Sequence, residues 1–97
     1  MSDVTNIVIE VKAGDDWQRM VFEGREAWAL ARLIEGGDKG VTPLQRPAPR
    51  WSAYVFKLRQ AGLAIETLHE AHYGPFAGHH GRYILRTPVR VLREVVA

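Results

Sequence analysis

The chain opens with two short runs that favour β-strands. Ile7, Ile9 and Val11 are spaced by two, which places one continuous apolar face on a strand. A second β-rich run, WQRMVF at residues 17–22, follows the sequence AGDD. Because glycine and aspartate supply turn chemistry, residues 1–23 predict a β-hairpin.

The hydrophobic period changes after Gly24. Apolar side chains then recur at i, i+3, i+4 and i+7, the spacing of one helix face, and they are Ala27, Leu30, Ala31 and Ile34. The glycine pair at 36–37 is predicted to end this helix, because glycine is favoured just past a helix C-terminus.

A proline-containing segment, KGVTPLQRPAPR, leads to the next helix. Thr42 and Pro43 predict one short helical turn, because proline is tolerated at the first helical position. Pro47 and Pro49 prevent that turn from continuing far.

A second helix is predicted over residues 50–61, with Gly62 at its end. Its apolar stripe consists of Trp51, Tyr54, Val55 and Leu58. Aromatic side chains at helical spacing are usually core, so Trp51 and Tyr54 are assigned to the core rather than to base stacking. The opposite, solvent-facing surface is predicted to consist of Arg50, Ala53, Lys57 and Gln60.

Strand-like alternation returns in LAIETLHEAHY and RYILRT, which together predict a second hairpin. Ile65 is predicted on one face of the first strand, and Glu66 and Glu70 on the other. The second strand is predicted to separate Tyr83 and Leu85 from Arg82, Ile84 and Arg86, and the Arg82 side chain is expected in solvent. The connection at residues 74–81 holds three glycines and one proline and is too long for a tight turn.

The tail at residues 88–97 fits two structures. Val89 and Val91 have the spacing of a strand, whereas Val89, Leu92 and Val96 equally fit a helix. Both alternatives stay open.

Length and composition indicate one small α+β domain over residues 1–97. With no cysteine, disulfides and thiolate sites are excluded. No apolar run approaches the roughly 18 residues of a membrane span, and the sequence MSDVTNIVIEVK lacks a signal-peptide pattern. We therefore expect a cytoplasmic protein with no membrane partner.

Charge is distributed unevenly between the two parts of the chain. Residues 1–40 hold eight acidic and five basic side chains, whereas residues 41–97 hold three acidic and eight basic ones. Seven of those eight bases are arginine, which forms bidentate pairs with phosphate or guanine. A basic C-terminal part favours a polyanionic partner.

The predicted order of hairpin, helix, short turn, helix and hairpin is the layout of a winged helix-turn-helix domain. It divides the chain into an N-terminal hairpin (1–23), a helix-turn-helix (24–62), a wing (63–87) and a tail (88–97). In this layout the last helix enters the major groove of DNA, and the wing loop reaches an adjacent groove or phosphate.

Short motifs between residues 25 and 87 resemble those of small bacterial and phage winged helix-turn-helix domains. In those, a helix ending L-R-x-x-G leads into a strand I-x-T, a wing and Y-x-L. The matching residues here are Leu58, Arg59, Gly62, Ile65, Thr67, Tyr83 and Leu85. The resemblance implies a winged-helix fold, DNA binding and no enzymatic activity. Pro47 and Pro49 depart from it, because many relatives continue a regular helix there.

Candidate DNA contacts lie on the second helix, before it and on the wing. They are Arg46, Arg50, Ser52, Ala53, Lys57, Gln60, His79, His80 and Arg82. The alternative for the helix residues is an ordinary solvated face. Arg59 is as well explained by a structural ion pair with Glu26 or Glu66.

The four histidines between residues 69 and 80 predict no metal site. His69 and His72 are three apart on a strand and face opposite sides, and His79 and His80 are expected at a mobile loop tip. Metal ligands must converge on one point. The sequence also lacks a nucleophile–base–acid set and a phosphate-binding glycine loop, so we expect no catalysis, no cofactor and no small-molecule substrate.

The sequence leaves two possible functions. The leading one is a double-stranded DNA-binding module, a transcriptional or phage-type regulator, with helix 50–61 in the major groove and loop 74–81 as wing. The alternative is a protein-interaction module on the same scaffold. A homodimer is also expected, because paired half-sites are common among helix-turn-helix proteins and because the apolar strips at 7–11 and 89–96 exceed what one small core needs.

Overall fold

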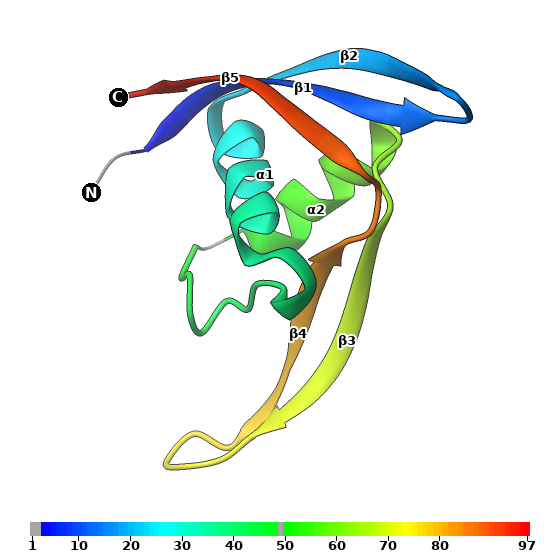
Figure 1. Ribbon diagram of the computed structural model, residues 1–97. Coiled ribbons are helices and arrows are strands. Elements are labelled where there is room, and N and C mark those ends of the chain that lie inside the picture. The colour runs from blue at the N-terminus through cyan, green and yellow to red at the C-terminus, as the bar shows by residue number, and fades with distance from the viewer. Residues whose placement is uncertain (1–2, 49) are drawn as a thin grey trace.

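A three-stranded sheet covers one helix, a second helix packs against the first, and a two-stranded hairpin projects away from the sheet, as Figure 1 shows. The computed structural model describes residues 3–48 and 50–97. Its elements are, in chain order, β1 (Val4–Ala13), β2 (Asp16–Glu23), α1 (Gly24–Gly36), the short 3₁₀ helix η1 (Gly37–Lys39), α2 (Trp51–Gln60), β3 (Ile65–His72), β4 (Gly78–Leu85) and β5 (Val89–Val96). This α+β arrangement confirms the expected fold class. Neither helix of the described chain is long and apolar enough to cross a membrane.

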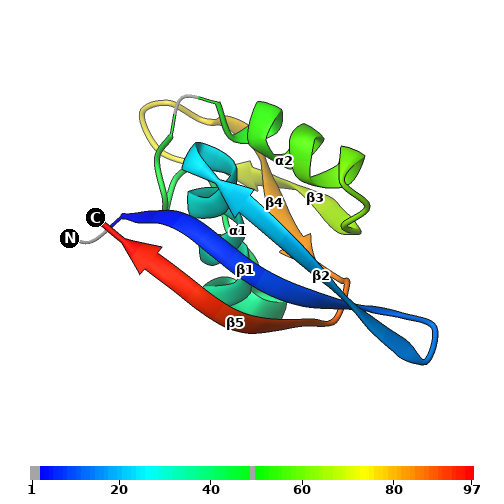
Figure 2. The same cartoon turned by 90° about the horizontal axis from the view of Figure 1, so that it is seen from above.

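The N-terminal hairpin and the tail form one antiparallel sheet in the order β2-β1-β5, seen from above in Figure 2. The tail is a strand, which settles the choice that its sequence leaves open. Val11 pairs with Val89 near one end of β1, and Val4 pairs with Val96 near the other. A helical tail would leave the backbone groups along this edge of β1 unpaired.

The core lies between that sheet and α1. Ile7 and Ile9 on β1 are fully buried, as are Ala27 and Leu30 on the predicted stripe of α1. Leu33 is also fully buried although it lies off the stripe, because α1 packs against the sheet and against α2. The apolar strip at residues 7–11 therefore belongs to the core, and it is wrong to count it as surplus available for a dimer.

Helix α2 packs on α1 through the face that its hydrophobic spacing predicts. Trp51, Val55 and Leu58 are buried, and the ring centroids of Trp28 and Trp51 lie 5.3 Å apart. Between the helices, the carbonyl of Thr42 accepts hydrogen bonds from the backbone N–H groups of Gln45 and Arg46 at 3.2 and 3.0 Å. The short turn expected at Thr42 is thus present as a single hydrogen-bonded turn that does not continue into a helix.

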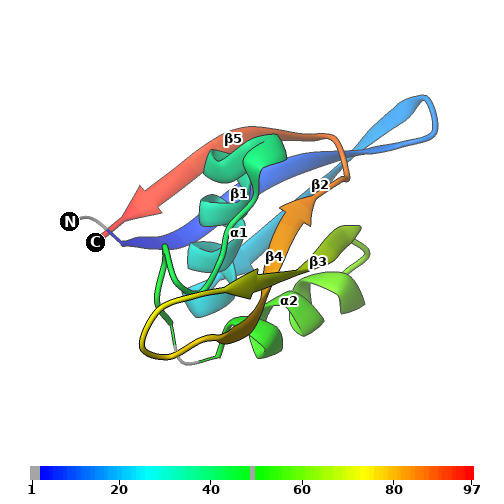
Figure 3. The ribbon, with the colours of Figure 1, turned by 90° about the horizontal axis from the view of Figure 1, so that it is seen from below.

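The second hairpin pairs Ile65 with Leu85 at its base and His72 with Gly78 near its tip. Its connection is shorter than the predicted loop at 74–81, because strand pairing continues through His79, His80 and Gly81. The expectation that His79 and His80 sit on a loop tip is therefore wrong. We call this β3–β4 hairpin the wing; Figure 3 shows it from below, beside α2.

Both faces of the wing's base are covered. Tyr83 stacks on Trp51 of α2, with 6.0 Å between ring centroids. Ile84 lies on the other face, on the same side as Arg82 as predicted, and it is only 3% exposed because that face is covered as well. Val41 adds a backbone bridge to Tyr83, with reciprocal hydrogen bonds of 2.8 Å.

Candidate nucleic-acid interface

The outward face of α2 carries polar, small and aromatic side chains and no acidic one. Among the predicted contact residues, Arg50, Ser52, Lys57 and Gln60 are exposed, and Ala53 is half-buried. Phe56 lies between them with 57% of its surface exposed. Sequence reasoning missed Phe56, although its position off the apolar stripe is the signal that would have found it.

Arg59 ties α2 to the wing. Its guanidinium donates to the carbonyl of Ile65 and, at 2.9 Å, to the hydroxyl of Thr67. The ion pair expected with Glu26 or Glu66 is not among the salt bridges of the described residues. Because both acceptors are neutral, Arg59 keeps its positive charge on the side of α2 that faces β3.

Arg46 is joined to α1 rather than projecting freely. Its guanidinium lies 2.7 Å from a carboxylate oxygen of Glu35, and the same carboxylate is 3.3 Å from Arg32. The indole N–H of Trp51 donates to the Arg46 carbonyl at 2.6 Å. These contacts fix the segment that leads into α2.

Inside the wing, Glu70 links Arg82 and His80. Its carboxylate oxygens lie 2.6 Å from the Arg82 guanidinium and 3.0 Å from His80 Nε2. Arg82 also donates to the carbonyl of Lys39 at 2.8 Å. Because Arg82 and His80 are partly buried and already bonded, the expectation that the Arg82 side chain lies in solvent is wrong.

The wing tip is braced by a pair of histidines. His72 Nδ1 and His80 Nδ1 lie 2.9 Å apart, and His72 Nε2 is 3.0 Å from the carbonyl of Phe76. His79 is exposed. It lies four residues before Tyr83 on β4, so it is on the face of the wing that α2 covers at its base. Within the described ranges, no three metal-ligating side chains are grouped closely enough to hold an ion.

The hydrogen bond from Arg82 holds the pKa of Glu70 below its ordinary value, with a smaller contribution from the hydrogen bond of His80 and partial opposition from burial. A carboxyl with a lowered pKa stabilises the fold above its ordinary pKa, and this stabilisation disappears as the pH falls through the lowered pKa. Arg82→Gln is expected to raise the Glu70 pKa toward its ordinary value.

An NMR titration of the Glu70 carboxyl measures this change. Arg86→Gln is the matched control, because Arg86 pairs with Glu66 at 2.6 Å on the same hairpin. An unchanged Glu70 pKa in Arg82→Gln would contradict the ion pair, whereas an equal shift in both variants would indicate a general loss of wing structure.

The charges of the C-terminal half are only partly gathered on one surface. Arg46, Arg82 and Arg86 each pair with a carboxylate, and Arg90 lies 3.9 Å from Glu10. Four cations of this half have no carboxylate partner within the described residues: Arg50, Lys57 and Arg59 lie around α2, and Arg93 lies apart from them on β5. The structure therefore narrows the candidate interface to α2 and its flanks.

Comparison with known families gives one match. A family model described as a winged helix domain matches residues 19–95, a range that contains most of β2 and every later helix and strand except the last residue of β5. Searches of curated proteins and of solved structures return no match. Strand β1 precedes the matched range, yet it is the central strand of the larger sheet.

Proposed function

Because this chain belongs to the winged helix domain family, we propose that it is a non-catalytic module that binds double-stranded DNA inside the cell and regulates transcription. Helix α2 enters the major groove, and the wing lies beside it. The observation that carries this proposal is the outward face of α2, which is exposed and contains no acidic side chain. An acidic face would be repelled by the phosphates that line the groove.

Phosphate contacts come from the cations around α2. Arg50 precedes the first turn of the helix, where the helix dipole also favours an anion. Lys57 is exposed in the middle of the helix, and Arg59 lies toward the wing. Arg46 and Arg82 contribute less, since each exchanges a carboxylate partner for a phosphate on binding.

Base contacts come from Ala53, Phe56 and Gln60, which lie three or four residues apart and share one helix face. Glutamine forms a bidentate pair with adenine, and alanine or phenylalanine packs on the methyl group of thymine. This composition favours sites that contain A·T pairs. Arg59, the residue type that most often reads guanine, is held by Ile65 and Thr67.

The salt dependence of binding tests the proposal. Three phosphate contacts predict a slope of log affinity against log salt of roughly −2 to −3. Lys57→Gln is expected to reduce that slope by about 0.9, because it removes one cation from an exposed position. Fluorescence polarisation with a duplex selected from a random pool, repeated across a salt series, measures both slopes.

Phe56→Ala is the matched variant on the same helix face. It removes a base contact, so we expect lower affinity for the selected duplex. Because it removes no charge, we expect the salt slope to stay unchanged. No binding by the parent at low salt, or unchanged binding in both variants, would overturn the DNA-binding proposal.

We also propose that two copies bind together, because paired half-sites suit two-fold symmetric dimers. The edge strand β5 offers a surface for this contact. Leu92 and Val96 on that strand are 44% and 49% exposed, and among residues 3–48 and 50–97 β5 pairs along one edge only, with β1.

A second candidate function is docking of a protein partner by the wing tip. Tyr73 and Phe76 are 88% and 89% exposed, and residues 71–81 contain no lysine or arginine. Exposed aromatic side chains without cations are typical of protein contacts more than of phosphate contacts.

Replacing both aromatics with serine separates the two functions. If the tip docks a protein, the Tyr73→Ser/Phe76→Ser variant keeps the parent's DNA affinity and salt slope. Weaker DNA binding in the same polarisation assay would assign the tip to the duplex instead.

A further inference from the structure

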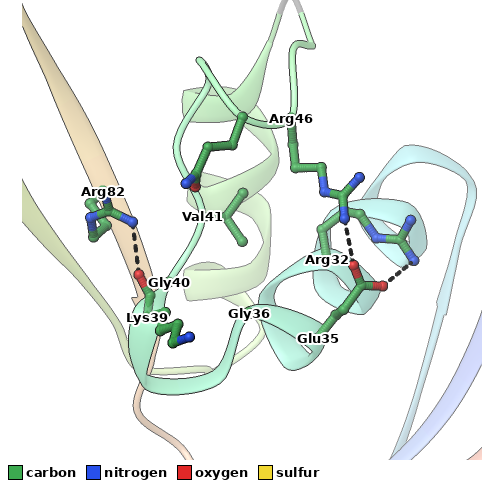
Figure 4. Close-up of a pocket in the computed structure, with 9 residues that line it drawn as sticks. Arg32, Glu35, Gly36, Lys39, Gly40, Val41, Arg46 and Arg82 are labelled. Carbon is green, nitrogen blue, oxygen red and sulfur yellow. Dashed lines mark hydrogen bonds and ion pairs between the residues drawn. The ribbon is translucent and has the colours of Figure 1, made fainter. Parts of the chain in front are cut away.

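A cleft of about 430 Å³ lies where the C-terminal end of α1, η1, the following turn and β4 meet (Figure 4). Ligand sites commonly have volumes of about 300–1,000 Å³, so the cleft has room for a small molecule or a charged group. Its charged lining consists of Arg32, Lys39, Arg46 and Arg82 with one carboxylate, Glu35.

The cations of this cleft outnumber the carboxylates that neutralise them. Arg32 and Arg46 share the single carboxylate of Glu35. Arg82 is paired with Glu70, which lies outside the lining. Lys39 has no carboxylate within ion-pair distance in the described part of the chain. The cleft therefore keeps an excess of positive charge.

Arg32 also has a donor that nothing in the described chain satisfies. Its side chain is only 13% exposed, and its Nε–H is buried without a hydrogen-bond acceptor among the described residues. Buried polar groups are normally paired, and each guanidinium has five N–H donors. One carboxylate cannot satisfy two such groups, so the two guanidiniums have donors left for water or for the oxygens of a ligand.

We infer that this cleft binds a phosphate group. The planar fork of an arginine matches phosphate oxygens in a bidentate way, and such charge-assisted hydrogen bonds are among the strong ones. The phosphate belongs either to a small free molecule or to the backbone of a nucleic acid, which present the same oxygens. This inference does not depend on DNA binding, because inorganic phosphate alone tests it.

The cleft joins the segments that frame the proposed interface. Arg46 precedes α2 and is fastened to it through Trp51, whereas Arg82 belongs to β4 and holds the Lys39 carbonyl (Figure 4). The cleft therefore has cations from the entry to α2 and from the wing on its two sides.

Thermal unfolding of the parent protein in increasing inorganic phosphate, at fixed pH and ionic strength, tests the inference. A ligand that binds only the folded state raises Tm, so we expect Tm to rise above that in matched chloride. Lys39→Gln and Arg46→Gln are expected to weaken the apparent phosphate affinity about tenfold, equivalent to the loss of one charge-assisted contact. Arg93→Gln, an exposed cation on β5, is the control and keeps the parent's response.

Lys39 is exposed and has no carboxylate partner in the described chain, so its substitution tests the cleft without disturbing the fold. No rise of Tm beyond matched chloride, or an equal rise in Lys39→Gln, would overturn the inference. A rise that needs about tenfold more phosphate in Lys39→Gln and that Arg93→Gln keeps unchanged would support it.

Binding of Lys39→Gln to duplex DNA identifies the source of the phosphate. If a backbone phosphate occupies the cleft, the salt slope falls by about 0.9 and inorganic phosphate competes with the duplex. If a free ligand occupies it, the slope stays that of the parent while the Tm response to phosphate is weakened. A parent that binds no DNA but responds to phosphate would overturn the proposed function and leave the cleft supported.

Discussion

Leu58→Ala is expected to lower the free energy of unfolding by roughly 2–5 kcal/mol. Leu58 is fully buried at the centre of the apolar face of α2. Its carbonyl also accepts the backbone N–H of Leu63 at 3.2 Å, where the chain leaves the helix. Truncation removes buried methyl groups and leaves a cavity, and the packed elements around it move in to fill it only partly. Urea denaturation monitored by circular dichroism measures the loss.

Phe56→Ala provides the control on the same helix. It removes a larger apolar side chain from a position that is 57% exposed, so the change should stay within about 0.5 kcal/mol. A loss below about 1 kcal/mol for Leu58→Ala, or similar losses for the two variants, would show that the wrong face of α2 is assigned to the core.

The elements that the sequence predicts well are those whose hydrophobic period is complete within a short segment. The spacing of two in Ile7, Ile9 and Val11 marks the buried face of β1, and the spacing of three and four marks Leu30 in α1 and Leu58 in α2. Burial of one face determines these patterns, so they can be read without knowing what packs against them.

Elements that depend on a distant partner are harder to predict. The tail fits a strand and a helix equally, and it becomes β5 because the free edge of β1, 78 to 92 residues earlier, accepts it. Ile84 alternates with Tyr83 as a half-exposed strand would, yet it is buried because η1 and α1 cover the second face of β4. Neither partner is visible from the local pattern.

The contacts of charged side chains are even harder to predict from the local sequence. Residue type identifies Arg46, His80 and Arg82 as candidate DNA contacts, but it does not show that each is bonded to a carboxylate. Those carboxylates come from α1 and β3. Lys57, in contrast, is exposed as its sequence position predicts, because the apolar spacing within one helix is enough to place it on the solvent-facing side.

Gly40→Ala is expected to destabilise the protein by roughly 2–5 kcal/mol, the combined cost of a strained backbone and an overpacked contact. Gly40 has a φ of +71° and a ψ of −169°, a conformation that residues with a Cβ atom rarely adopt. A Cβ at this position would lie 2.6 Å from the carbonyl oxygen of Tyr83 and 2.7 Å from Cγ1 of Ile84. Both are held in β4, and the Tyr83 carbonyl accepts the N–H of Val41.

Gly37→Ala separates the two costs. Gly37 also has a positive φ, +53°, but a Cβ there would meet nothing within 4 Å. This variant is expected to lose only about 1–3 kcal/mol from the backbone conformation, whereas Gly40→Ala must in addition push β4 away from the turn at Val41. Urea denaturation of the two variants compares the losses, and hydrogen exchange of the Val41 and Tyr83 amides reports the bridge between them. Equal losses, with both amides protected as in the parent, would contradict the close approach of β4 to Gly40.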